Sequence, residues 1–255
     1  MDIKEVIGID ASKLTLDCCI HGSGLQKIFS NNSKGIGQLA DWALSNSCFE
    51  KKQVLFVFED TGLYTFELIS FLNDGNYYMF VGSGLEIKRS LGIARGKDDK
   101  ADAKRIAQYG YRIREEITPY HMPSKSLVTL KRLMSLRRKL IVHRGGYVAN
   151  LKEQKRVLKN EEVLFAAQQA VVDVIAVQIA GIEKEIERII AQDPELERLQ
   201  KLLTGITGIG KVTARFLIVY TVGFTAFENW GNLLLMLVLP HSPIDLEPVS
   251  KAGIK

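Results

Sequence analysis

Four acidic residues have types and positions suited to metal-dependent chemistry on phosphate esters. Asp10 ends a short apolar, β-branched run, and Glu59 directly follows the continuous apolar run Gln53–Phe58. Asp99 and Asp102 are three residues apart, so they share one face if they lie on a helix. Strand ends that are neighbours in one sheet would bring the first two acids to a common edge, where the helical pair could join them.

Four carboxylates at one edge would repel one another unless cations neutralised them. Two Mg²⁺ ions (or Mn²⁺) about 3.5–4 Å apart would do so, one activating the attacking oxygen and the other stabilising the leaving oxygen of a phosphodiester. Spacing alone also fits a plainer interpretation, because acids at strand ends form turns and acids at a helix N-terminus interact favourably with its dipole. Four basic side chains beside the helical pair could hold a nucleic-acid backbone: Lys97, Lys100, Lys104 and Arg105.

Strands and helices that could position the acids follow from the apolar patterning. Three strands come first, and further strands then alternate with helices, which predicts an α/β fold with a mixed sheet flanked by helices. The expected strands are Glu5–Asp10, Leu14–Ile20, Gln26–Ser30, Gln53–Phe58 and Tyr77–Val81, with a helix from about Tyr64 to Leu72.

The chain becomes helical in character after Lys97. Isoleucines then recur in steps of four and three residues, which is a heptad-like seam. The pattern predicts a helical extension over residues 124–200, either a long hairpin or a coiled-coil dimer arm, and simple core packing explains the stripe equally well. The seam residues are Ile175, Ile179, Ile182, Ile186 and Ile189.

A glycine-rich segment near residue 208 resembles a P-loop only superficially. Val212 stands where the Mg²⁺-binding Ser or Thr of a P-loop is required, so a nucleotide site is excluded. A helix-hairpin-helix-like turn fits better, because Gly208 and Gly210 would let backbone N–H groups approach a phosphate, and Lys211 would add charge. A tight turn between two helices that touches no DNA is the alternative.

Bulk composition limits the classes of protein. A net charge of +5 and a pI near 9.0 fit a nucleic-acid partner without demanding one. Cys18, Cys19 and Cys48 have no disulfide or zinc spacing. The N-terminus shows no secretory signal, and no run of about 18 apolar residues predicts a membrane span, so a reducing cytoplasm is the expected compartment.

Three blocks of residues carry a family resemblance. Gly8–Lys13, Glu59–Tyr64 and Lys97–Ala103 resemble the signature blocks of the DEDD transposases of the insertion-sequence-110 group, relatives of the Piv-type DNA invertases. The N-terminal domain of that family resembles the RuvC resolvase. The resemblance therefore implies a ribonuclease-H-like (RuvC-like) domain over residues 1–123. It also maps the acidic tetrad onto Asp10, Glu59, Asp99 and Asp102, although Asp98 stands where the family usually has Thr.

The same resemblance implies a function and partners. It predicts a transposase or site-specific recombinase that acts on the ends and target of an insertion element, with an element-encoded guide RNA and homo-oligomers formed through the helical extension. Residues 201–230 would begin the C-terminal domain, with Thr207–Gly210 in place of a Pro-Gly-Ile-Gly-like motif. Two alternatives stay open: a catalytically silent nucleic-acid-binding remnant, and a Holliday-junction resolvase-like nuclease.

The resemblance stops after Trp230, and residues 231–255 are interpreted as an aberrant tail. From Met236 onward, codons can be chosen so that a shifted frame resembles the next family block, including its Ser-Gly pair, and we hypothesise a frameshift close to Trp230. In the family a serine of that block is the proposed nucleophile. No serine of this chain has that context, and Ser242 and Ser250 receive no role, so this copy is expected to be inactive in full transposition.

Overall fold

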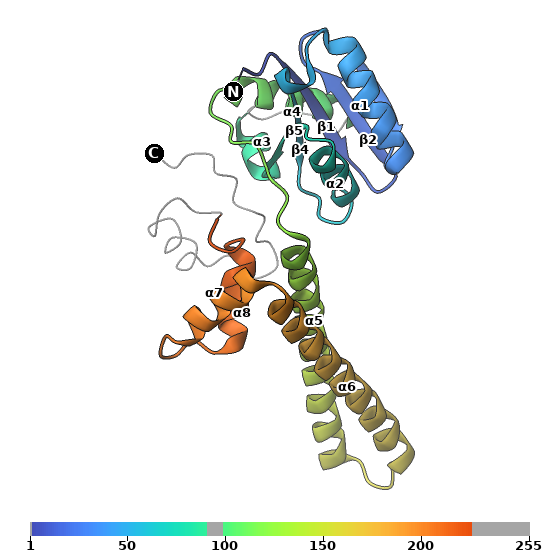
Figure 1. Cartoon of the computed structure of the whole chain (residues 1–255). Helices are drawn as coiled ribbons and strands as arrows, with labels where there is room; N and C mark the ends of the chain where they lie inside the picture. The colour runs from blue at the N-terminus through green and yellow to red at the C-terminus, as the bar shows by residue number, and fades with distance from the viewer. Residues whose placement is uncertain (1, 91–98, 226–255) are drawn as a thin grey trace. The chain divides into compact units, whose positions relative to one another are not determined.

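A computed structural model describes residues 2–90 and 99–225 of the chain, without the side chains of residues 88–90 and 99–101. These residues divide into two compact units that meet in sequence at Met122 and Pro123. We call residues 2–122 the α/β unit and residues 123–225 the helical unit, and each is described by itself (Figure 1).

The α/β unit contains a five-stranded mixed sheet in the order β3-β2-β1-β4-β5. The first three strands form an antiparallel meander, and β4 and β5 continue the sheet in parallel with β1. The predicted α/β class and its ribonuclease-H-like arrangement are thereby confirmed. The strands are β1 (Glu5–Ala11), β2 (Thr15–Ile20), β3 (Gln26–Ser30), β4 (Val54–Glu59) and β5 (Tyr78–Gly82).

Helices cover both faces of this sheet (Figure 1). On one face, Ile9 and Phe58 belong to a core that includes residues of α1 (Ser33–Ser47) and α2 (Phe66–Asp74). The opposite face carries a second core, in which Val6 and Val57 pack with Ile106 of α4 (Asp99–Ile113). Side chains alternate between the faces of a strand, so even-numbered β1 residues and odd-numbered β4 residues face α4. The short helix α3 (Gly84–Ser90) follows β5.

Glycine allows α4 to lie very close to the sheet. A Cβ atom on Gly8 would collide with the backbone of Ala103 and Ala107, and a Cβ on Gly110 would lie 2.6 Å from Val57 Cγ2. Along α4, Ala103 comes first and lies beside Gly8 of β1. Gly110 comes later and lies beside Val6, which precedes Gly8 in β1. Helix α4 therefore runs opposite to β1, and its N-terminus points towards the end of β1 that carries Asp10.

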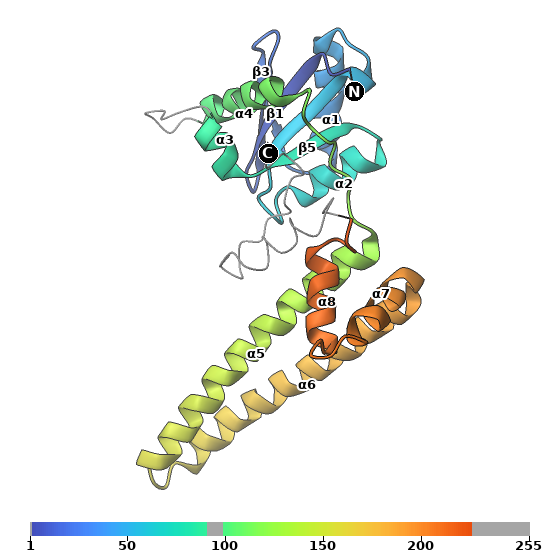
Figure 2. The same ribbon diagram turned by 90° about the vertical axis from the view of Figure 1, so that its left-hand side faces the viewer.

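The helical unit is an antiparallel hairpin of two long helices followed by two short ones (Figure 2). Its buried core lies near the base of the hairpin and combines Leu130, Ile186 and Ile218 with neighbouring apolar residues. Of the predicted isoleucine seam, Ile186 and Ile189 are buried, and the residues nearer the tip are only half-buried. The helices are α5 (Lys125–Val157), α6 (Glu162–Gln192), α7 (Pro194–Thr204) and α8 (Lys211–Tyr220).

Helix α6 is unexpectedly apolar for an exposed helix. One 18-residue window within it has a mean hydropathy of 1.8 and is only 6% buried. By length and composition alone, α6 is the one helix of the described residues that could cross a membrane, a property that the sequence analysis did not predict. The sequence analysis did not predict this property because Gln168, Gln169 and Asp173 interrupt the apolar run of α6. Core helices of soluble proteins meet the same criterion, so it does not establish a membrane span.

Candidate functional site

Asp10 and Glu59 lie at the ends of adjacent strands. The parallel register of β1 and β4 pairs Ile9 with Phe58, and the two acids are the next residue of each strand. Because Ile9 and Phe58 face α1 and α2, alternation directs the two acids to the α4 face. Both acids are half-buried there. The structure thus places two of the four predicted acids side by side at one edge and on one face of the sheet.

Helix α4 brings Asp102 towards the same edge. Its neighbour Ala103 packs on Gly8, which precedes Asp10 by two residues and faces the same way. The Asp102 side chain is 44% exposed, and its Oδ1 lies 3.6 Å from Nη1 of Arg105 on the same helix. Asp99 begins α4, one turn nearer the N-terminus, but its side chain lies outside the described residues.

Carboxylate oxygens are the ligands that Mg²⁺ and Mn²⁺ prefer, so the residue types fit a divalent metal. Among the side chains that the structure describes, which exclude Asp99, no three acidic, His or Cys side chains are grouped closely enough to hold an ion. Close to Glu59, the hydroxyl of Thr61 is buried without a hydrogen-bond partner in the same set of residues. The described part of the site is therefore an acidic edge that an ion or a further ligand could complete.

Asp17 is a further acid at this edge that sequence analysis missed. In the antiparallel β1–β2 pair it lies directly opposite Asp10, and directly opposed residues project on the same face. Only 9% of Asp17 is exposed. Burial, and secondarily the charge of Asp17, raise the pKa of the Cys18 thiol. The sequence placed Asp17 on the second strand, but only the register of the β1–β2 pair puts it opposite Asp10.

Two loops next to the acids are tied together by Asn31. Its side-chain amide donates hydrogen bonds to the carbonyl of Ser12, 2.7 Å away, and to that of Tyr64, 2.8 Å away. Ser12 follows β1, and Tyr64 ends the block that begins with Glu59. Sequence analysis did not assign Asn31 to the site, and helix α1 is instead capped by Asn32, which accepts from Gly35 N at 2.9 Å.

The loop after Glu59 has its own internal support. The Asp60 carboxylate accepts from the backbone N–H of Gly62 at 2.8 Å and from the Thr65 hydroxyl at 3.0 Å. Gly62 has a φ of +69°, which favours glycine at this position. This loop geometry accounts for the Asp-Thr-Gly that follows Glu59. Gly84, the first residue of α3, has no side chain and so leaves the space that the Glu59 carboxylate occupies.

The predicted phosphate-binding residues fall in two places. Lys104 is exposed on α4. Burial raises the pKa of the Cys19 thiol, and the positive charge of Lys104 offsets part of that rise. Arg105 pairs with Asp102. Lys97, and the tail interpreted as frameshifted, lie outside the described residues, as does the side chain of Lys100.

The glycine-rich segment forms the turn between α7 and α8. Gly208 has a φ of +91°, and Gly210 is the N-terminal cap of α8 without a side-chain hydrogen bond. Lys211 Nζ lies 3.1 Å from Glu187 Oε1, and Arg215 Nη2 lies 3.3 Å from the same oxygen. Hydrogen bonds from these two cations lower the pKa of the Glu187 carboxyl. Lys211 would have to leave an exposed ion pair to bind phosphate, which costs little.

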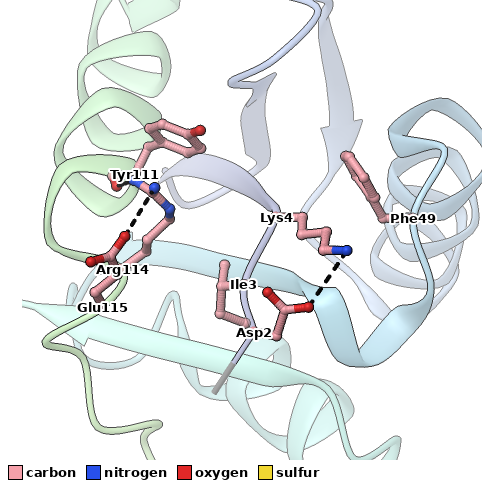
Figure 3. A pocket seen from close by; sticks show the side chains of 7 residues that line it. All are labelled: Asp2, Ile3, Lys4, Phe49, Tyr111, Arg114 and Glu115. Atoms are coloured by element: carbon pink, nitrogen blue, oxygen red, sulfur yellow. Dashed lines mark hydrogen bonds and ion pairs between the residues drawn. The ribbon is translucent and has the colours of Figure 1, made fainter.

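A separate hollow lies at the opposite end of β1 from Asp10 (Figure 3). Its charged side chains are paired with one another: Lys4 Nζ is 3.5 Å from Asp2 Oδ2, and Arg114 Nη2 is 3.2 Å from Glu115 Oε1. Arg114 also lies over the ring of Tyr111 at 3.9 Å. These paired charges, and the distance along β1, separate the hollow from the acidic edge.

The fold and the acidic edge define a ribonuclease-H-like domain with two carboxylates at the ends of adjacent strands. Residues 7–158 match the family model of the DEDD transposases of the insertion-sequence-110 group, described as transposase, and the chain belongs to this family. It is also similar to the pilin gene-inverting proteins of Moraxella bovis and Moraxella lacunata. Each is 28% identical over 240 residues, covering 90% of this chain and 70% of the relative.

Proposed function

We propose that this chain is a transposase or site-specific DNA recombinase that cuts and rejoins phosphodiesters at its acidic edge. The observation that carries the proposal is the pairing of Asp10 with Glu59 at adjacent strand ends, on the face that the N-terminus of α4 approaches. The family and the pilin gene-inverting relatives support the class of reaction.

The carboxylates of Asp10, Glu59, Asp99 and Asp102 would hold Mg²⁺ or Mn²⁺, and we propose two ions. Bound there, the ions would supply Lewis-acid activation and stabilise charge on the oxygens of a phosphodiester. The protein itself orients these acids through the close contact of α4 with β1, and Asn31 ties the flanking loops. Lys97, Lys100, Lys104 and Arg105 would hold the DNA backbone beside them, and Gly208, Gly210 and Lys211 would add a second phosphate contact.

DNA at the element ends and target is the proposed substrate, with an element-encoded guide RNA as a second partner. Homo-oligomers would form through the helical unit, where Val163, Val174 and Val177 of α6 are more than 60% exposed.

Cleavage assays with Mg²⁺ or Mn²⁺ on element ends, four-way junctions and plain duplex test the proposal. Asp10→Asn and Asp102→Asn should each lower the cleavage rate by about 100-fold or more, because the charge that holds the ion is lost. Asp41→Asn, an equal charge change on exposed α1, is the matched control and should keep wild-type activity.

The substrate pattern separates the proposal from its alternatives. Cleavage of element ends that depends on both acids supports a transposase. Cleavage of junctions alone would replace it with a Holliday-junction resolvase, and DNA binding without any cleavage would replace it with a silent binding protein. Full activity in both acid variants would contradict the carboxylate site itself.

A further inference from the structure

The positive charge of this protein is concentrated in one helix. Helix α5 has ten Lys and Arg residues and one acidic residue, Glu153, within its 33 positions. The whole chain has a net charge of +5, so everything outside α5 is net negative. Helix α6, its partner in the hairpin, has the opposite character, with five acidic and two basic residues.

Four of these cations share one face of α5. Lys131 and Arg132 precede Arg138 and Lys139 by seven residues, which is close to two helical turns and a rise of about 10.5 Å. All four are exposed. The side that faces α6 is different, because Leu130 is fully buried and Arg137 pairs with Glu183 of α6 at 2.6 Å.

The acidic residue of α5 lies away from this face. Glu153 pairs with Arg156 near the far end of α5, at 3.0 Å. Among the described residues, Lys131 and Lys139 form no ion pair, and Arg132 and Arg138 each interact with a neighbouring group. A folded protein with a net acidic remainder has no structural need for such a concentration of charge on one exposed helix, so a polyanion is the partner that fits it.

We propose that Lys131, Arg132, Arg138 and Lys139, the α5 basic face, bind the phosphate backbone of double-stranded DNA. This proposal rests on the proposed function, which makes DNA the substrate. From Lys131 to Lys139 the face extends about 12 Å along the helix, the length of roughly three to four base pairs, and duplex DNA has one negative charge per 1.7 Å or so. Contacts of this kind position DNA without reading its sequence. The α5 basic face would therefore add a sequence-independent contact to the duplex that the proposed function makes the substrate.

The test compares two full-length variants that lose the same charge. One is K131Q/R132Q/R138Q/K139Q, and the matched control is K184Q/R188Q/R198Q/K201Q, whose four residues are exposed on α6 and α7. Fluorescence anisotropy measures binding of a 30-base-pair duplex between about 50 and 200 mM salt, a range that resolves counterion release. Circular dichroism and thermal unfolding verify that both variants fold.

We expect the α5 variant to bind the duplex at least tenfold more weakly near 100 mM salt. The slope of log affinity against log salt should become shallower by about three to four, because each lost phosphate contact removes about 0.9. The control should stay within about twofold of the wild type.

Equal weakening in the two variants would overturn the proposal, since net charge alone would then explain the effect. Weakened binding of an RNA hairpin or of anionic lipid vesicles, with duplex binding unchanged, would also overturn it. A wild-type chain that binds no duplex defeats the proposed function as well. By contrast, duplex binding and cleavage that survive in the α5 variant defeat only the inference about α5.

Discussion

The α/β unit and the helical unit are built on different principles. In β4 the five residues 54–58 are fully buried, whereas the 33-residue α5 has only Leu130 and Leu151 buried. Burial of apolar side chains stabilises the sheet and its helices. The arm formed by α5 and α6 instead exposes charge on one helix and apolar residues on the other. The α/β unit is thus specified by its interior, whereas outside the core at its base the helical arm is specified by its surface residues.

Glycines illustrate the same contrast. Gly8 is a position where a neighbouring backbone excludes any side chain. Gly145 and Gly146 stand in the middle of α5 with nothing within 4 Å of a Cβ atom. Glycine lowers helix stability in such positions, so their presence has no explanation in the packing of α5 itself.

The largest expected effect is that of Gly8→Ala on the α/β unit. The added methyl group collides with backbone atoms of α4, which cannot move aside like a flexible side chain, so the unfolding free energy should fall by about 3 kcal/mol. Hydrogen–deuterium exchange followed by mass spectrometry should show the loss of protection in the α/β unit and unchanged protection in α5 and α6. Unchanged protection of α4 and β1 would show that the contact is not needed.

A smaller effect is expected from Tyr120, which belongs to the core of the α/β unit. Burial, and secondarily Asp60, raise the pKa of its phenol to about 12. Since the phenol ionises near its ordinary pKa of 10 in the unfolded chain, its stabilising contribution is complete below pH 10 and is lost as the pH rises to about 12.

Tyr120→Phe should therefore reduce the loss of unfolding free energy between pH 9 and pH 11.5 by up to about 2 kcal/mol. Tyr147→Phe, in an exposed position on α5, is the control and should leave the pH dependence as in the wild type. Chemical denaturation at both pH values measures the difference. Identical profiles for all three proteins would mean that the Tyr120 phenol is not protected by the fold.

The smallest expected effect is a gain in stability. Gly146→Ala meets no neighbouring atom and replaces a poor helix former with the best one, so it should stabilise α5 by about 0.5–1 kcal/mol. Slower hydrogen exchange around residue 146 would be the readout. A loss of stability, or of self-association at high protein concentration, would instead indicate that another molecule approaches the helix closely at this glycine.

Most of the sheet could be predicted from local pattern. The apolar run 53–58 is typical of a strand buried on both faces, and β4, which begins at Val54, is such a strand. Less of the site could be predicted. Alternation and strand order indicated Asp10 and Glu59, but Asp17 becomes visible only when the hairpin register places it opposite Asp10. The sequence analysis gave Asn31 no role in the site, and only the folded loops show which carbonyls it joins.

The sequence by itself determined the periodicities, the positions of the acids along the chain and the charge of α5, because these depend only on neighbouring residues and residue type. The tertiary structure alone decided which face each acid occupies and in which direction α4 crosses β1. Strand register and the close approach permitted by Gly8 are properties of residues far apart along the chain, and no local pattern encodes them.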